Sequence, residues 1–122
     1  MREVKAIVRP QRLEQVMEAL HAIPGLPGVT VSKVHAYAGF QRQDSQAASD
    51  AQETDLTKLE IVVTDDLVES VVTAIGHASH TGRPGDGIVY VVPVERFMRV
   101  RALAQGAGAS EESERTRADR TT

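Results

Sequence analysis

The sequence of 122 residues contains no cysteine and no tryptophan, and aromatic residues make up only 3% of it. Without cysteine, disulfide bonds and thiolate metal ligands are excluded, which fits a reducing compartment and predicts a cytoplasmic protein. Because aromatic side chains are so few, the core must be built from valine, isoleucine, leucine and alanine. No apolar run reaches the roughly 20 residues that a membrane-spanning helix needs, so we expect no membrane insertion.

Charge and length narrow the possibilities further. Lys and Arg number 14 against 17 Asp and Glu, and the resulting net charge of −3 offers no basic field for nucleic acid. The first residues alternate charged and apolar side chains and lack the apolar segment of a signal peptide. The length suits one domain. We expect residues 1–103 to form that domain, and residues 104–122, which contain no large apolar side chain, to be a disordered tail.

Hydrophobic periodicity predicts the order strand, helix, strand, strand, helix, strand. The expected strands lie at residues 4–9, 29–37, 59–63 and 88–92, and the expected helices at residues 13–20 and 66–75. This order is the split βαβ, or ferredoxin-like, pattern (βαββαβ). It is an α+β fold with a four-stranded antiparallel sheet and both helices on one face. Because the strands look apolar on both sides, we expect the other face to be buried by oligomerisation.

The ends and connections of these elements carry further expectations. Asp65 or Asp66 is placed to cap the second helix, with Glu69 completing a capping box. Residues 38–57 are rich in Gln, Ser, Asp and Ala, and this composition predicts a long mobile loop between two strands. The last apolar segment, Phe97–Val100, is expected to be extended.

The most informative stretch is the glycine loop, residues 81–87, which reads Thr-Gly-Arg-Pro-Gly-Asp-Gly and directly precedes the last strand. A short loop with three glycines lets backbone N–H groups converge on an anion, above all a phosphate. Arg99 and Arg101 could add charge-assisted hydrogen bonds to the same anion. The alternatives are an ordinary turn before a strand, and two arginines on the solvent face of a strand.

Four segments of the sequence match one known pattern. They are the glycine loop with the Ile-Val-Tyr-Val that follows it, Val-Glu-Arg-Phe-Met-Arg-Val-Arg at 94–101, Val-Lys-Ala-Ile-Val-Arg-Pro at 4–10, and Pro-Gly-Val-Thr-Val-Ser at 27–32. In this combination the chain resembles the P-II nitrogen-regulatory protein family. The resemblance implies a non-enzymatic signalling homotrimer with ATP, ADP or AMP, with or without Mg²⁺, in clefts between subunits. It also implies that the long loop regulates a partner protein.

The resemblance further implies which residues contact the nucleotide. The backbone of the glycine loop would meet the phosphates, and Arg99 and Arg101 would pair with them. Val29, Thr30 and Val62 would lie near the adenine. The complete implied set is Val29, Thr30, Ala36, Tyr37, Ala38, Val62, Gly82, Arg83, Pro84, Gly85, Asp86, Gly87, Arg99 and Arg101.

The chain also departs from the family pattern. Ile88 stands where the family commonly has a phosphate-binding Lys, so one cation fewer should lower triphosphate affinity and shift preference toward ADP or AMP. Phe40 stands where a Gln helps organise Mg²⁺ and 2-oxoglutarate, unless Gln41 or Gln43 takes that place, and Leu56 replaces a carboxylate-binding Lys. The long loop contains no Tyr for uridylylation. These departures are typical of a divergent member. Its Pro-Gly-Leu-Pro-Gly at 24–28 and its form of the glycine loop are most similar to the branch linked to metal efflux, which implies a transporter as the partner.

Other functions remain open from the sequence. His77 and His80, three residues apart at the end of the second helix, are weak metal-ligand candidates. A lone His35 is interpreted as a surface strand residue. The alternative functions are a slow nucleotide phosphohydrolase, and a metal-binding or structural trimer that has lost nucleotide binding.

Overall fold

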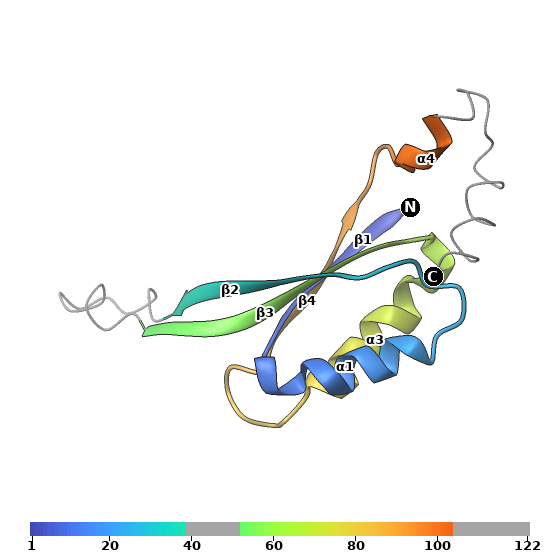
Figure 1. The fold of residues 1–122 in the computed structure, drawn as a ribbon. Helices are drawn as coiled ribbons and strands as arrows, with labels where there is room; N and C mark the ends of the chain where they lie inside the picture. Colours follow the sequence, from blue (N-terminus) through green and yellow to red (C-terminus); the bar gives the residue numbers. More distant parts are fainter. Residues whose placement is uncertain (39–51, 104–122) are drawn as a thin grey trace.

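A four-stranded antiparallel sheet with helices packed on one face makes up the chain as far as the computed structural model describes it, at residues 1–38 and 52–103 (Figure 1). The strand order β2-β3-β1-β4 confirms the predicted ferredoxin-like α+β fold. The elements are β1 (Arg2–Val8), α1 (Leu13–His21), β2 (Thr30–Ala38), β3 (Gln52–Val63), α3 (Val68–Ser79), β4 (Gly87–Pro93) and α4 (Val100–Leu103), with 3-10 turns at Pro10–Arg12 and Asp65–Leu67.

The core lies between the sheet and helices α1 and α3. Alternate residues of a strand point to the same face of a sheet, whereas residues three or four apart in a helix lie on the same side of the helix. The fully buried residues follow both rules and come from β1, β3 and the two helices: Val4, Ala6, Val8, Val16, Leu59, Ile61, Val63, Val71 and Ile75. The prediction of both helices on one face is therefore confirmed.

The open face of the sheet, opposite the helices, is not apolar throughout. At its centre Lys5 Nζ lies 3.0 Å from Glu60 Oε2 and 3.3 Å from Glu3 Oε1. The hydrogen bond to Glu60, and then that to Glu3, raises the pKa of Lys5, and the same bond lowers the pKa of Glu60. Apolar side chains flank this cluster on β4, where Ile88 and Tyr90 are exposed. The expectation of strands that are apolar on both sides was therefore wrong at the middle of this face.

Strands β2 and β3 continue well past the helices as a two-stranded hairpin (Figure 1). Their pairing runs from Thr30 opposite Glu60 to Ala38 opposite Gln52. Residues 52–57, assigned to the long loop from their polar composition, thus belong to β3, and that assignment was wrong. The ladder satisfies backbone groups whatever the side chains are, so composition alone did not reveal it. The predicted mobility of residues 39–51 and of the tail at 104–122 lies outside the described residues.

The second helix begins differently from the prediction. Thr64 occupies the N-cap position without a capping hydrogen bond from its side chain, and the first turn starts at Asp65. Asp65 Oδ1 instead lies 3.2 Å from the amino terminus of Met1 and 3.7 Å from Arg2 Nε. The reason is the pairing of β1 with β3, which places the chain's first residues beside the end of β3. The predicted Asp cap with a capping box was therefore wrong.

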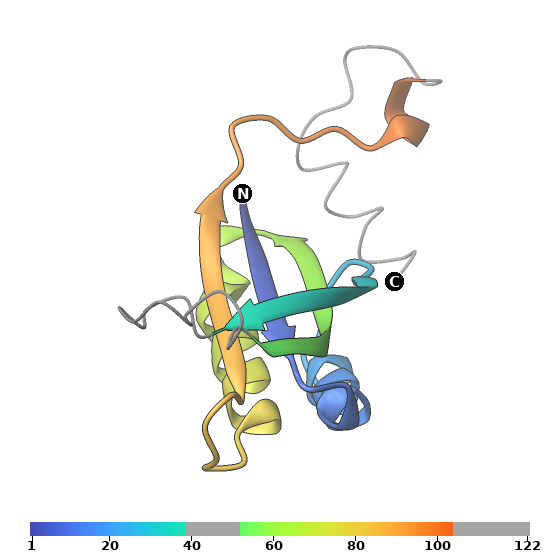
Figure 2. The ribbon, with the colours of Figure 1, turned by 90° about the vertical axis from the view of Figure 1, so that its left-hand side faces the viewer.

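The segment after β4 also differs from expectation. Residues 97–99 have no regular structure, and Val100 begins the short helix α4 instead of continuing an extended segment. Helix α4 lies beyond the end of β4, away from α1 and α3 (Figures 1 and 2).

Candidate functional site

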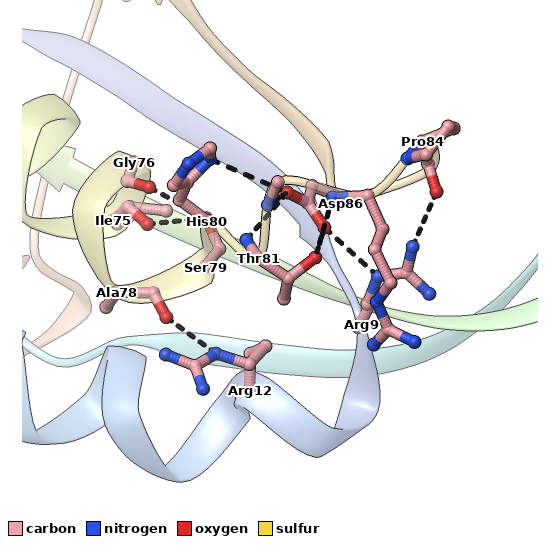
Figure 3. Close-up of polar contacts among 12 residues, drawn as sticks. Arg9, Arg12, Ile75, Gly76, Ala78, Ser79, His80, Thr81, Pro84 and Asp86 are labelled. Carbon is pink, nitrogen blue, oxygen red and sulfur yellow. Dashed lines mark hydrogen bonds and ion pairs between the residues drawn. The ribbon is translucent and has the colours of Figure 1, made fainter.

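The glycine loop connects α3 to β4 and is organised around the carboxylate of Asp86 (Figure 3). Asp86 Oδ2 accepts hydrogen bonds from the backbone N–H of Thr81 at 2.7 Å and of Gly82 at 3.0 Å. Its Oδ1 accepts one from the Thr81 hydroxyl, and that hydroxyl in turn accepts the N–H of Arg83 at 3.2 Å. The aspartate of the Gly-Asp-Gly motif therefore holds the loop in shape and does not point away from it.

Arg9 braces the same loop from the end of β1. Its Nε donates to Asp86 Oδ1 at 3.2 Å, and its Nη2 donates to the carbonyl oxygen of Pro84 at 2.6 Å (Figure 3). A Cβ at Gly85 would lie 3.4 Å from Arg9 Nη2, an ordinary contact, so glycine is favoured there by its φ of +88° rather than by lack of space. An ion pair that is also hydrogen-bonded fixes the relative position of its two groups in addition to neutralising their charges.

The sequence analysis missed Arg9, and the signal that could have found it is topological. In the predicted fold β1 pairs with β4, and the register places Val8 opposite Gly87. The residue after Val8 must then meet the residue before Gly87. Arg9 and Asp86 are 77 residues apart in sequence, so only this pairing brings them together.

The loop's hydrogen bonds give Asp86 an unusual acidity. The Thr81 hydroxyl first, then the backbone N–H groups and Arg9, hold the pKa of Asp86 well below its usual range. A carboxylate with a lowered pKa in the folded state stabilises that state fully above the unfolded pKa of about 4, and this contribution is lost as the pH falls through the folded value.

We therefore expect low pH to remove the stabilisation that the Asp86 carboxylate gives to the folded state. In urea denaturation at pH 7, Asp86→Asn should unfold at a lower urea concentration than the parent chain. The gap between the two midpoints should narrow steadily below about pH 4. A gap that stays constant from neutral to strongly acidic pH would show that the carboxylate's charge does not stabilise the loop.

The structure separates the predicted phosphate-binding residues into two groups. The glycine loop lies at the start of β4, whereas Arg99 and Arg101 follow its end (Figures 1 and 2). Seven strand residues at a rise of about 3.3 Å place these ends roughly 20 Å apart. Arg101 is exposed on α4, and the guanidinium carbon of Arg99 lies 5.6 Å from the centroid of the Phe97 ring. Within one chain, loop and arginines do not form one site.

The other residues expected to bind the nucleotide also lie in different parts of the sheet. Val62 lies opposite Glu3, level with Val92 near the end of β4, whereas Thr30 lies opposite Glu60, level with Tyr90 at the middle of that strand. Val29 directly precedes Thr30. Ala36, Tyr37 and Ala38 lie at the far end of β2, on the hairpin beyond the glycine loop, where Tyr37 is exposed. In the described part of the chain, Gly82 to Gly87 form the longest continuous group of predicted site residues, and hydrogen bonds to Asp86 hold this group in shape.

The two histidines at the end of α3 occupy different backbone environments. His77 is exposed in the last turn of α3, whereas His80 is the C-cap residue and has an extended backbone. His80 Nδ1 lies 3.6 Å from Asp86 Oδ2, which joins it to the edge of the glycine loop. Among the residues that the structure describes, neither histidine belongs to a group of three or more side chains that could hold a metal ion.

The structure describes two of the residues that depart from the family pattern, Ile88 and Leu56. Ile88 is 57% exposed on the open face directly after the glycine loop, and Leu56 lies in β3 opposite Val34. Phe40, Gln41 and Gln43 lie outside the described residues. Within residues 1–38 and 52–103, no helix is long and apolar enough to cross a membrane.

Known proteins are similar to this chain over most of the residues that the structure describes. A family model described as nitrogen regulatory protein P-II matches residues 1–103. The chain is 37% identical over 113 residues to the nitrogen regulatory protein P-II of Azospirillum brasilense, covering 89% of this chain and 99% of that protein. It is 36% identical to the protein of the same name from Rhodospirillum rubrum, with the same coverage. A nitrogen regulatory protein P-II homolog of Arabidopsis thaliana is 40% identical over 88% of this chain and 56% of its own length.

Proposed function

The chain belongs to the nitrogen regulatory protein P-II family, and we propose that it binds an adenine nucleotide between neighbouring copies of itself in a homotrimer. The family consists of regulatory signalling proteins rather than enzymes. The proposal assigns the nucleotide's phosphates to the glycine loop of one copy and to Arg99 and Arg101 of the next.

The observation that carries this proposal is the separation of the two phosphate-type groups. The glycine loop has a shape fixed by Asp86 and Arg9 before any ligand arrives, and such preorganisation lowers the cost of binding. Arg99 and Arg101 lie beyond the opposite end of β4. If all of them contact the same phosphates, a second copy must supply the arginines. Head-to-tail contacts of this kind close into a ring when the rotation between copies closes, and a homotrimer is such a ring.

The hydrogen bonds inside the loop indicate where the phosphates would lie. The N–H groups of Thr81, Gly82 and Arg83 already donate within the loop. The proposal therefore assigns the phosphate contacts to the backbone of residues 85–87. Arg9 and Asp86 neutralise each other, and Ile88 adds no charge. Attraction for phosphate would thus depend on the exposed Arg83 and on the neighbouring copy's arginines, which favours ADP or AMP over ATP.

The open face of the sheet supplies a surface for assembly. Ile88 and Tyr90 are exposed there beside the Lys5 cluster, on the side opposite α1 and α3. Three copies would meet through the centre of this face, with Ile88 and Tyr90, on the edge strand β4, at the margin of the contact. We further propose that residues 39–51, which connect β2 to β3 in the sequence, contact a partner protein, and that a transporter is the partner. Nucleotide binding would then change how the partner is engaged.

Calorimetry with ATP, ADP and AMP tests the binding step. We expect at least one of the three to bind, and Arg101→Ala to weaken that binding by about tenfold or more, because a hydrogen bond to a charged group contributes about 1.5–3 kcal/mol. Arg96→Ala, which removes another exposed arginine from the same segment, should bind like the parent chain. No binding by any of the three at millimolar concentration, or equal binding by Arg101→Ala, would contradict the proposal.

A mixing experiment tests the location between copies. Asp86→Ala should damage the loop half of the site, and Arg101→Ala the arginine half. When the two variants are co-expressed in equal amounts, random assembly should restore roughly a quarter of the sites, because the intact halves then meet across an interface. If binding required both halves from one chain, the mixture would bind no better than either variant alone.

A further inference from the structure

The stem of the β2–β3 hairpin carries a cluster of three potential metal ligands away from the proposed nucleotide site. His35 Nδ1 lies 2.7 Å from Glu53 Oε1 and 2.8 Å from Asp55 Oδ1. The ligand atoms of the three residues all lie within 4.8 Å of one another. Among the residues that the structure describes, this is the group whose donor atoms converge closely enough to surround an ion.

Strand pairing explains why these side chains meet. His35 of β2 lies directly opposite Asp55 of β3, and Glu53 lies two residues from Asp55. Residues two apart in a strand point to the same face. Side chains on neighbouring strands reach directly opposite and diagonal positions. The sequence analysis considered His35 alone because the register of the two strands was not known.

The geometry is more specific than an exposed ion pair requires. One ring nitrogen carries at most one proton and donates one good hydrogen bond, yet two carboxylate oxygens approach the same Nδ1. A metal ion could accept electron pairs from all three atoms at once. Around zinc, bonds of about 2.0–2.2 Å in a tetrahedron place ligand atoms about 3.4 Å apart. Small side-chain rotations would open the cluster to that spacing.

The donor set indicates the class of ion. Imidazole suits zinc, copper and nickel, whereas sites with only oxygen ligands suit magnesium or calcium. One imidazole with two carboxylates therefore favours a borderline divalent ion such as Zn²⁺, with its remaining position open to water. The side chains of His35, Glu53 and Asp55 are 66%, 49% and 79% exposed, so an ion from solution can reach them.

We propose that His35, Glu53 and Asp55 form a binding site for a divalent transition-metal ion. The ion would cross-link β2 to β3 at the stem of the hairpin, on the segments that lead to residues 39–51. The proposal rests on the geometry of this cluster alone. It stands whether or not a nucleotide binds at the glycine loop.

Calorimetry with ZnCl₂ alone, without nucleotide, tests the site. We expect one Zn²⁺ per chain, and binding weakened at least about tenfold in His35→Ala and in the double variant Glu53→Gln/Asp55→Asn, because even residues that only support a metal ligand cost that much when changed. His77→Ala/His80→Ala is the matched control and should bind like the parent chain. The side chains of all five residues are exposed, so circular dichroism should show unchanged folding.

A second measurement separates this site from general surface binding. Zn²⁺ should raise the thermal unfolding midpoint of the parent chain, because an ion bound only to the folded state stabilises it. It should leave the midpoint of His35→Ala unchanged. The proposal is overturned if Zn²⁺ does not bind at 1 mM, if binding survives in His35→Ala, or if it is lost in the His77/His80 control. Any of these results would identify the cluster as an ordinary ion pair.

Discussion

Replacing Gly87 with alanine is expected to lower the free energy of unfolding by about 2–6 kcal/mol, from backbone strain and overpacking together. Gly87 starts β4 with φ +117°, a backbone conformation that residues with a side chain rarely adopt. An added Cβ would overlap the carbonyl oxygen of Ile7 and lie 3.2 Å from the Cα of Val8. These are backbone atoms, so no side-chain rotation can relieve the contact, and β4 would have to move away from β1.

Two other glycines provide a graded control for this effect. Gly82 has φ +83° but open space where a Cβ would lie, so Gly82→Ala should cost only the strain, about 1–2 kcal/mol. Gly28 has neither a positive φ nor a neighbour within 4 Å, and Gly28→Ala should leave stability unchanged or raise it by up to about 1 kcal/mol. Urea denaturation of the three variants measures the series. Equal losses in all three would show that close packing at Gly87 is unimportant.

Replacing Ile88 with lysine is expected to tighten ATP binding by about tenfold to a hundredfold, the effect of one added hydrogen bond from a charged group. Ile88 directly follows the glycine loop and is exposed, so a longer charged side chain can be accommodated without disturbing the core. The gain should grow with the number of phosphates, because each adds negative charge near the new cation. AMP binding should change least.

Calorimetry with ATP, ADP and AMP on Ile88→Lys and on Tyr90→Lys provides the comparison. Tyr90 lies two residues further along β4 on the same open face, so Tyr90→Lys adds the same charge farther from the loop. Its effect on ATP should be small and should disappear at high salt. If the two variants gain equally, or if AMP gains as much as ATP, then a general charge effect explains the result and Ile88 does not border the phosphates.

Much of the fold was predictable because its signals are local. Alternation around Val4 to Val8 and helical spacing from Leu13 to Leu20 are visible without knowing any contact, and their order leads to the ferredoxin-like sheet. Predictions that needed a partner from elsewhere in the chain were wrong. The Asp65 cap depended on where the amino terminus lies, and the length of β3 depended on its pairing with β2.

For the candidate site, the sequence by itself determined the residue types: a loop of glycines with one Asp, two nearby arginines, and Ile88 in place of a cation. Only the tertiary structure decided what these residues can do. It turned Asp86 inward through Thr81 and Arg9, and it put Arg99 and Arg101 at the other end of β4. It also brought His35 to Glu53 and Asp55. The physical reason is that strand register, a non-local property, sets which distant side chains meet.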